Sequence, residues 1–211
     1  MNAPSPHRPK RALILIDVQN EYVTGKLLIE YPDVGLSLAN ISRAAQGAIE
    51  AGIPIVVVQQ DAPPGSPIFA KGSHGWELHA SVAGIPRAHH IGKALPSAFA
   101  GTDLRDWLRA HEIETLVIAG YMTQNCNDAT ARQAVHEGWS VEYLSDATGA
   151  VPYSNRAGHA SAEEIHRLYC VVLQSRFAAV MSTDEWLHAI QHGTAPERSG
   201  VYASNRKALL G

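Results

Sequence analysis

Residues 11–20 read Arg-Ala-Leu-Ile-Leu-Ile-Asp-Val-Gln-Asn, an apolar run that stops at a carboxylate. Residues 12–16 are continuously apolar and do not alternate with polar residues. Runs of this kind are typical of strands that are covered on both faces, as in parallel sheets. The stretch therefore predicts a buried strand that places Asp17 at the carboxyl edge of a sheet.

Similar apolar runs predict the other strands of this sheet. Between them, apolar residues recur at helical spacing, as at Leu38, Ile41, Ala45 and Ala48. Repeated strand–helix–strand order with right-handed crossovers builds a parallel sheet between two layers of helices. We expect the α/β class, a Rossmann-like three-layer α/β/α fold with a mostly parallel six-stranded sheet. Its strands are predicted at residues 12–16, 53–58, 88–91, 115–119, 141–144 and 178–181.

Three further helices are predicted from the residues that start them. Thr102 can cap a helix whose first turn is acidic. Ser161 and Glu164 form an S-x-x-E capping box, and Thr183 similarly precedes an amphipathic segment. These signals set the expected starts of the helices near residues 103, 162 and 184.

The length of 211 residues predicts one domain over residues 1–211, with tails at residues 1–10 and about 196–211. Residues 61–87 are rich in proline and glycine and have no periodicity. A long irregular insertion of this kind usually shapes a binding site or is mobile. We therefore expect residues 61–87 to border the functional site.

Composition excludes several classes of protein. The 17 Lys and Arg residues against 20 Asp and Glu residues give a net charge of −3 without a basic cluster, which argues against a nucleic-acid or membrane partner. No apolar run approaches the roughly 20 residues that span a bilayer. Cys126 and Cys170 form no CxxC pair, so a disulfide framework and a zinc ribbon are not expected. A protein of the reducing cytoplasm is the expectation.

Three chemically active side chains follow predicted strands at the edge where ligands bind in parallel sheets. Asp17 follows the first strand, Lys93 the short third one, and Cys126 the loop after residues 115–119. A thiol, a proton acceptor and an ammonium together make a nucleophile with its base and charge stabiliser. Taken singly, each has a structural alternative: a turn carboxylate, a surface lysine and a small buried apolar residue.

Cys126 precedes a run of small residues that predicts the start of a helix packed on the sheet. The positive end of a helix dipole lowers the pKa of a thiol and favours the thiolate. We therefore expect Cys126 to be more reactive than Cys170, which lies among the apolar residues of a predicted helix.

Other common catalytic motifs are missing from the sequence. No GxxxxGK[ST] or GxGxxG motif supports a phosphate or dinucleotide site, and no GxSxG elbow supports a serine hydrolase. The cysteine-centred set is therefore the main candidate.

Three segments of the sequence, taken in order, form a set of motifs. They are Ala-Leu-Ile-Leu-Ile-Asp17-Val-Gln-Asn20-Glu-Tyr22, Lys93-Ala-Leu-Pro-Ser97-Ala98-Phe99-Ala-Gly-Thr102-Asp103-Leu104, and Gly120-Tyr-Met-Thr123-Gln-Asn-Cys126-Asn-Asp-Ala-Thr130-Ala131-Arg. Together, and in this order, they resemble a known family, the isochorismatase-like cysteine hydrolases, and the resemblance runs from about residue 11 to residue 187.

The resemblance implies a catalytic role for each residue of the set. Asp17 would take the thiol proton, Lys93 would hold Asp17 and the thiolate together, and Cys126 would attack a carbonyl to give an acyl-enzyme. The backbone N–H groups of Met122 and Cys126 would form the oxyanion hole, with a cis peptide bond between Tyr121 and Met122. It also implies a homo-oligomer, a dimer or tetramer.

The sequence differs from two branches of the family at residues important for their activity, which makes those two activities less expected here. The nicotinamidase branch has an Asp-x-His metal motif, whereas Asp61 is followed by Ala-Pro. Asp61, His74 and His79 remain candidate ligands for an adventitious metal, but we expect neither a metal nor another cofactor. Asn125 stands where nicotinamidases often have His, and true isochorismatases lack the nucleophile. The chain looks more like the broad amidohydrolase group with streptothricin hydrolase-like proteins.

The leading hypothesis is a cysteine hydrolase that cleaves a C–N bond of a small amide or cyclic amide through an acyl-enzyme on Cys126. The alternative is a catalytically idle member of the same fold that binds a small molecule or acts as a scaffold. Residues of the loops at the same edge are candidates for the substrate pocket, although some of them are expected only to pack. They are Tyr22, Phe69, Trp76, His79, Tyr121, Asn125 and Tyr153.

Overall fold

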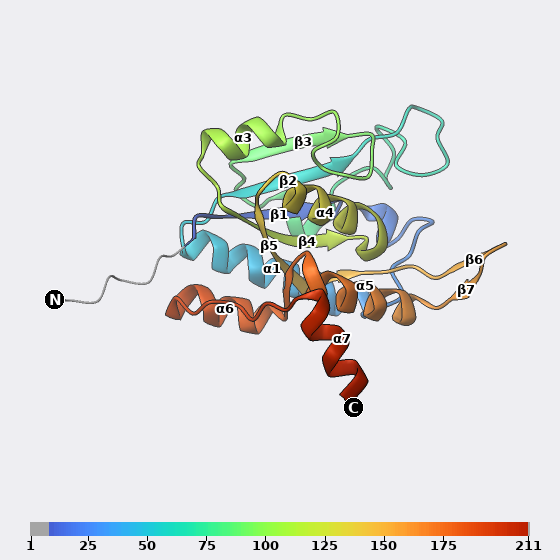
Figure 1. Cartoon of the computed structure of the whole chain (residues 1–211). Coiled ribbons are helices and arrows are strands. Elements are labelled where there is room, and N and C mark those ends of the chain that lie inside the picture. Colours follow the sequence, from blue (N-terminus) through green and yellow to red (C-terminus); the bar gives the residue numbers. More distant parts are fainter. Residues whose placement is uncertain (1–8, 211) are drawn as a thin grey trace.

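The computed structural model describes residues 9–210 and has a six-stranded sheet at its centre (Figure 1). The strand order is β3-β2-β1-β4-β5-β8, and every neighbouring pair is parallel. The strands are β1 (Arg11–Ile16), β2 (Ile55–Gln60), β3 (His89–Lys93), β4 (Thr115–Tyr121), β5 (Ser140–Gly149) and β8 (Ala179–Met181).

Strand β1 shows why the sheet lies between two layers of helices. Leu13 and Leu15 belong to one buried cluster, and Ala12, Ile14 and Ile16 belong to another. Successive side chains of a strand point to opposite faces, so each face of β1 contributes to a separate half of the core. The apolar run without alternation, which predicted this burial, is confirmed, and so is the three-layer α/β/α class.

Helices from both halves of the chain cover the two faces of the sheet. The cluster that contains Leu13 includes side chains of α1 and α6, whereas the cluster that contains Ile14 includes side chains of α3, α4 and α5. The helices are α1 (Val34–Glu50), α2 (Ala80–Ala83), α3 (Leu104–Ala110), α4 (Asp128–His136), α5 (Ala162–Arg176), α6 (Thr183–His192) and α7 (Val201–Leu210).

Two of the predicted helix starts move by one residue. The capping box at Ser161 is present. Helix α6 is capped by Ser182 rather than Thr183, because Ser182 has the extended backbone of an N-cap and the Thr183 hydroxyl donates to Asp146. At α3 the N-cap residue is Asp103, and the Thr102 hydroxyl accepts the Leu104 N–H at 3.3 Å.

Strands β2 and β5 end later in the sequence than predicted. Strand β2 runs on through Gln59 and Gln60, because these residues pair with Gly92 and Lys93 in the ladder with β3. Strand β5 extends to Gly149, past a register shift against β4. Hydropathy cannot identify such ends, since backbone pairing and not side-chain burial determines them.

The irregular segments carry more structure than the sequence indicated. Residues 61–87 contain α2, and residues 196–210, expected as a tail, contain the exposed helix α7. A hairpin of β6 (Tyr153–Asn155) and β7 (Gly158–Ala160) projects from the body in Figure 1 and was not predicted. The other predicted tail lies mostly outside the described residues. No helix within residues 9–210 is long and apolar enough to cross a membrane.

Candidate active site

Strand order places the candidate site at the point where the direction of chain winding reverses. The chain proceeds from β1 outward to β2 and β3 on one side, and then returns to β4 on the other side of β1. In open parallel sheets, ligands bind in the crevice outside the carboxyl ends of the strands at this point. Asp17 follows β1 here, and the loop with Cys126 follows β4.

The backbone around Asp17 is unusual. Asp17 has a φ of 52°, in the left-handed region that residues other than glycine rarely adopt. The Asp17 N–H still donates to the Val58 carbonyl at 2.9 Å, and the Asp17 carbonyl accepts the Gln19 N–H at 2.8 Å. The turn therefore leaves the strand at once and keeps the carboxylate at the carboxyl edge. Strained conformations of this kind are concentrated at functional sites.

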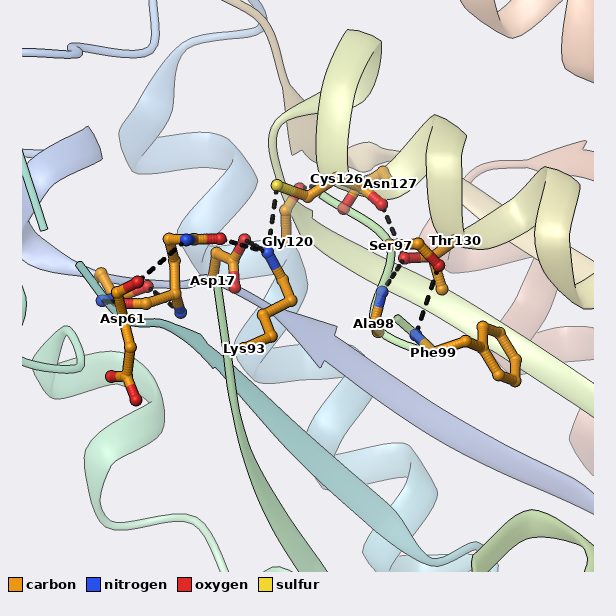
Figure 2. Close-up of polar contacts among 12 residues, drawn as sticks. Asp17, Asp61, Lys93, Ser97, Ala98, Phe99, Gly120, Cys126, Asn127 and Thr130 are labelled. Carbon is orange, nitrogen blue, oxygen red and sulfur yellow. Dashed lines mark hydrogen bonds and ion pairs between the residues drawn. The ribbon is translucent and has the colours of Figure 1, made fainter. Parts of the chain in front are cut away.

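Lys93 joins the three candidate catalytic residues. Its Nζ lies 2.7 Å from Asp17 Oδ2, 2.6 Å from Gln60 Oε1 and 3.3 Å from Cys126 Sγ. Figure 2 shows the side chain reaching from the end of β3 towards Asp17 and Cys126. The Asp17 and Lys93 side chains are completely buried. An ammonium has three donors, so these three acceptors account for all of them.

A π-helical turn carries the nucleophile candidate. The turn covers residues Thr123–Asn127 and continues into α4, so Cys126 does not lie in the first turn of the α-helix itself. Asn127 Nδ2 donates to the Gly120 carbonyl at 2.8 Å, and the Thr130 hydroxyl donates to the Cys126 carbonyl at 2.7 Å. These bonds fix the loop to the end of β4 and to α4 (Figure 2).

The end of β4 also requires close packing against β1. Gly120 has a φ of 106°, and a Cβ at this position would collide with the Ile16 carbonyl oxygen. The peptide bond between Tyr121 and Met122 is cis, the geometry that the resemblance implies. Glycine at position 120 therefore lets the loop that carries Cys126 approach the strand that Asp17 follows.

Electrostatics at the site favour a neutral thiol beside an ion pair. Burial raises the pKa of Asp17, although Lys93 opposes this. Burial lowers the pKa of Lys93, but the charge of Asp17 and the hydrogen bonds to Asp17 and Cys126 outweigh it and leave the pKa raised. Burial and the Asp17 carboxylate raise the pKa of the Cys126 thiol to about 12, against the opposing effect of Lys93.

The expectation of a lowered thiol pKa at Cys126 is therefore wrong for this state of the protein. Cys126 is only 5% exposed, and the negative charge of Asp17 disfavours a second anion beside it. The pKa of Cys170 is also raised to about 12, in this case by burial alone. Thiolate formation at Cys126 thus depends on a proton acceptor and not on a low intrinsic pKa.

A cavity of about 260 Å³ opens onto the Cys126 thiol. Of the residues predicted to contact substrate, Tyr22, Phe69 and Asn125 line this cavity together with Met122. Gln60, which also bonds Lys93, lines it as well. The cavity and the three catalytic candidates therefore form one site.

Other predicted pocket residues have different positions. Trp76 Nε1 donates to Asp61 Oδ1 at 2.6 Å, and the His79 ring caps α2 by accepting the Ser81 N–H at 3.2 Å. Both side chains form contacts within residues 61–87, and neither lines the cavity.

The two remaining tyrosines also lie outside this cavity. Tyr121 is fully buried, and its hydroxyl bonds to Ser37 at 2.7 Å, so it packs within the core. Tyr153 lines a neighbouring hollow, with its hydroxyl 3.9 Å from the Met122 sulfur. Position on a loop at the carboxyl edge of the sheet does not determine where a side chain points, so these two tyrosines do not line the cavity beside Cys126.

The candidate metal ligands are engaged elsewhere. Asp61 bonds to Trp76 and pairs with Lys71 at 3.2 Å, while His74 bonds to Thr24 and His79 caps a helix. Within residues 9–210, no three side chains of His, Cys, Asp or Glu gather in a way that could hold a metal ion.

Sequence reasoning missed the residues that support the catalytic candidates. Gln60 accepts from Lys93, and its backbone N–H donates to Gln19 Oε1 at 2.9 Å. Gln19 Nε2 donates back to the Gln60 carbonyl at 3.0 Å. Gln60 is the last residue of β2, and Gln19 lies three residues after the end of β1. A polar side chain at the carboxyl end of an apolar strand was therefore the signal available in the sequence.

The fold and site define an α/β protein with a buried thiol, carboxylate and ammonium at the reversal point of a parallel sheet. The isochorismatase domain family matches residues 11–185 of the chain. The chain therefore belongs to this family, which includes hydrolases that act on amides.

Known proteins with similar sequences or structures agree with this assignment. A solved structure from Burkholderia xenovorans LB400, described as a candidate isochorismatase, has 62% sequence identity and a TM-score of 0.95, covering 96% of this chain and 98% of that one. A streptothricin hydrolase of Streptomyces noursei is 34% identical over 66% of this chain and 54% of its own. The ureidoacrylate amidohydrolase RutB of Methylobacterium radiotolerans is 29% identical over 80% of this chain and 74% of its own.

Proposed function

We propose that this protein is a cysteine hydrolase that cleaves the C–N bond of a small amide or cyclic amide through an acyl-enzyme on Cys126. One observation carries the proposal. Lys93 Nζ lies 2.7 Å from Asp17 Oδ2 and 3.3 Å from Cys126 Sγ, and Cys126 lines a cavity of about 260 Å³. The amidohydrolase and streptothricin hydrolase among the relatives support the bond type.

Acylation begins from a carboxylate and a neutral thiol. The Cys126 sulfur attacks the substrate carbonyl carbon while its proton passes to Asp17, whose pKa burial has raised. Lys93 stays protonated beside both groups while the negative charge passes from the Asp17 carboxylate to the substrate carbonyl oxygen. The Met122 and Cys126 N–H groups are the proposed donors to the oxygen of the tetrahedral intermediate.

Release of the amine and hydrolysis complete the cycle. As the C–N bond breaks, Asp17 returns its proton to the leaving nitrogen, and a thioester to Cys126 remains. Water then attacks the thioester carbonyl while Asp17 takes one of its protons. When the C–S bond breaks, that proton returns to sulfur, so the acid product leaves and the thiol is restored. The sequence uses only side chains and backbone groups of this chain and needs no cofactor.

Intact-protein mass spectrometry tests the proposal with an activated substrate such as an acyl 4-nitroanilide. A burst of one 4-nitroaniline per chain and a matching acyl adduct on Cys126 are expected. Cys126→Ala should abolish both, whereas the matched control Cys170→Ala should retain them. Turnover without an adduct, or an adduct on another residue, would contradict the mechanism, and binding without turnover would favour the idle alternative.

Association with further copies of the chain is part of this proposal. Helices α5 and α7 expose large apolar side chains, including Leu168, Val171, Tyr202, Leu209 and Leu210. Exposed apolar patches of this kind often mark protein interfaces. A dimer or tetramer is expected by light scattering, and a monomer at micromolar concentration would contradict it. Cys126 must stay a free thiol to act, which fits the reducing cytoplasm.

A further inference from the structure

The walls of the cavity beside Cys126 are mainly apolar. Side chains of Leu27, Ile68, Phe69, Ala94, Pro96 and Met122 contribute to them. Its volume of about 260 Å³ is slightly below the 300–1,000 Å³ that is usual for sites of drug-sized ligands. Only a small group can enter, and most of its surface will touch hydrocarbon.

No acidic, basic or histidine side chain lines this cavity in the part of the chain that the structure describes. The cation nearest the nucleophile is Lys93, and its three donors already serve Asp17, Gln60 and Cys126. Two other lysines of the surrounding loops are engaged: Lys26 Nζ donates to the Pro67 carbonyl at 2.8 Å, and Lys71 pairs with Asp61.

A carboxylate on the substrate would therefore enter the cavity without a cation to pair with. Burying an unpaired charge in apolar surroundings is strongly unfavourable. The Asp17 carboxylate beside the thiol adds repulsion between like charges. The cavity thus selects against anions before any chemistry takes place.

Tyr22 supplies the hydrogen-bonding capacity that the apolar walls lack. It is 2% exposed and lines the cavity, with its ring packed on Phe69 and Tyr121 at centroid distances of 5.2 and 5.4 Å. Its hydroxyl makes no hydrogen bond to any residue between 9 and 210. Burial, together with the nearby Asp17 carboxylate, raises its pKa well above the ordinary value, so it remains a neutral donor.

We propose that the substrate is a small amide whose acyl group is uncharged and apolar, and that the Tyr22 hydroxyl is its buried hydrogen-bond partner. This inference rests on the proposed hydrolase function and adds a substrate class to it. Amides that carry a carboxylate on the acyl group are excluded as good substrates.

A matched pair of amides tests the charge selection. In 4-methylpentanamide and succinamate, the acyl chains differ only by an isopropyl group in place of a carboxylate of similar shape. The expected kcat/KM for ammonia release is at least about 100-fold higher for the neutral amide, since an unpaired buried charge is costly. Equal values, or a preference for succinamate, would overturn the proposal.

Binding is measured separately so that the two proposals can fail independently. Each amide is tested for protection of Cys126 against iodoacetamide in the wild-type protein. If neither amide is hydrolysed but 4-methylpentanamide alone protects, the hydrolase proposal fails and the cavity inference stands. If hydrolysis occurs on other amides but the neutral compound neither protects nor reacts, the cavity inference fails alone.

Two variants locate the selectivity in the cavity. Leu27→Arg adds a cation to the wall and should reduce the preference for the neutral amide at least about tenfold, whereas Leu27→Met should keep the preference. Tyr22→Phe should lower kcat/KM for 4-methylpentanamide about tenfold with little change in the preference, as expected for loss of one hydrogen bond. An unchanged preference in Leu27→Arg, or unchanged kcat/KM in Tyr22→Phe, would contradict the assignments.

Discussion

The two ends of strand β1 carry two buried ion pairs of opposite character. At its start, Arg11 forms a bidentate pair with Glu142, with the Arg11 side chain 9% and the Glu142 side chain 2% exposed. Beyond its end, Asp17 pairs with Lys93, and both side chains are completely buried. Burial is similar at both ends, so it does not explain why only one of the pairs makes a candidate for chemistry.

The two ion pairs differ in how completely the carboxylate oxygens are hydrogen-bonded. Both oxygens of Glu142 accept bonds from Arg11, and Trp186 Nε1 adds another at 3.0 Å. Asp17 Oδ1 has no conventional hydrogen-bond partner in the described chain, and the Lys93 ammonium is shared with a thiol. A fully bonded pair holds the fold together, whereas an incompletely bonded carboxylate keeps the capacity to accept a proton.

The largest expected effect comes from Asp17→Asn, which keeps the shape of the side chain and removes its capacity as a base. Turnover should fall by about 10²–10⁴-fold, the usual contribution of a positioned general base. Steady-state kinetics give the loss, and circular dichroism checks that the fold is retained. Near-full activity with an unchanged spectrum would show that Asp17 only shapes the turn.

The opposite result is expected for Arg11→Met at the other end of the strand. This change leaves the Glu142 carboxylate buried without its partner, which should reduce the free energy of unfolding by about 3–5 kcal/mol. Urea denaturation measures the loss, and kcat of the remaining folded protein should change little. If kcat falls as far as in Asp17→Asn, the two ends of β1 are not functionally distinct.

The pH dependence of activity sharpens the comparison further. Asp17 must be unprotonated to act as a base, so activity should fall as the pH drops through its raised pKa. Lys93 lowers this pKa by its charge, and therefore Lys93→Met should shift the acid limb to higher pH and reduce kcat. A pH–rate profile of both proteins provides the measurement. An acid limb that stays in place would exclude Asp17 as the titrating group.

A smaller effect is expected in the reactivity of the two thiols. The pKa of each is raised to about 12, so a base and not acidity must distinguish them. Iodoacetamide should modify Cys126 faster than Cys170, because only Cys126 has a carboxylate beside it that can accept the thiol proton as the sulfur reacts. Peptide mapping of the time course measures both rates. Equal rates in the wild type would contradict the role of Asp17 as the proton acceptor for Cys126.

Chelation should have no measurable effect on activity. The proposed steps use only groups of the chain, and Asp61, His74 and His79 are engaged in separate contacts. Activity before and after exhaustive EDTA treatment is the measurement. A loss that zinc, iron or manganese restores would require a metal in the mechanism.

Local signals in the sequence were sufficient for the architecture and for the candidate catalytic set. Continuous apolar runs indicated doubly covered strands such as residues 12–16, and the S-x-x-E pattern at Ser161 indicated a helix start. These features depend on neighbouring residues of the chain, so they can be identified without the fold. The same applies to Asp17 and Cys126 as the residues that follow strands at the carboxyl edge.

Only the tertiary structure decided what those residues can do. Gln60 became an acceptor for Lys93 because β2 pairs with β3, and Trp76 and His79 turned away from the cavity because Asp61 and α2 engage them. The raised pKa of Cys126 likewise follows from burial and from Asp17, more than a hundred residues away in the sequence. Desolvation and charge pairing depend on atoms that distant segments of the chain bring together. Strand and helix patterns, in contrast, depend on residues that are close together in the sequence.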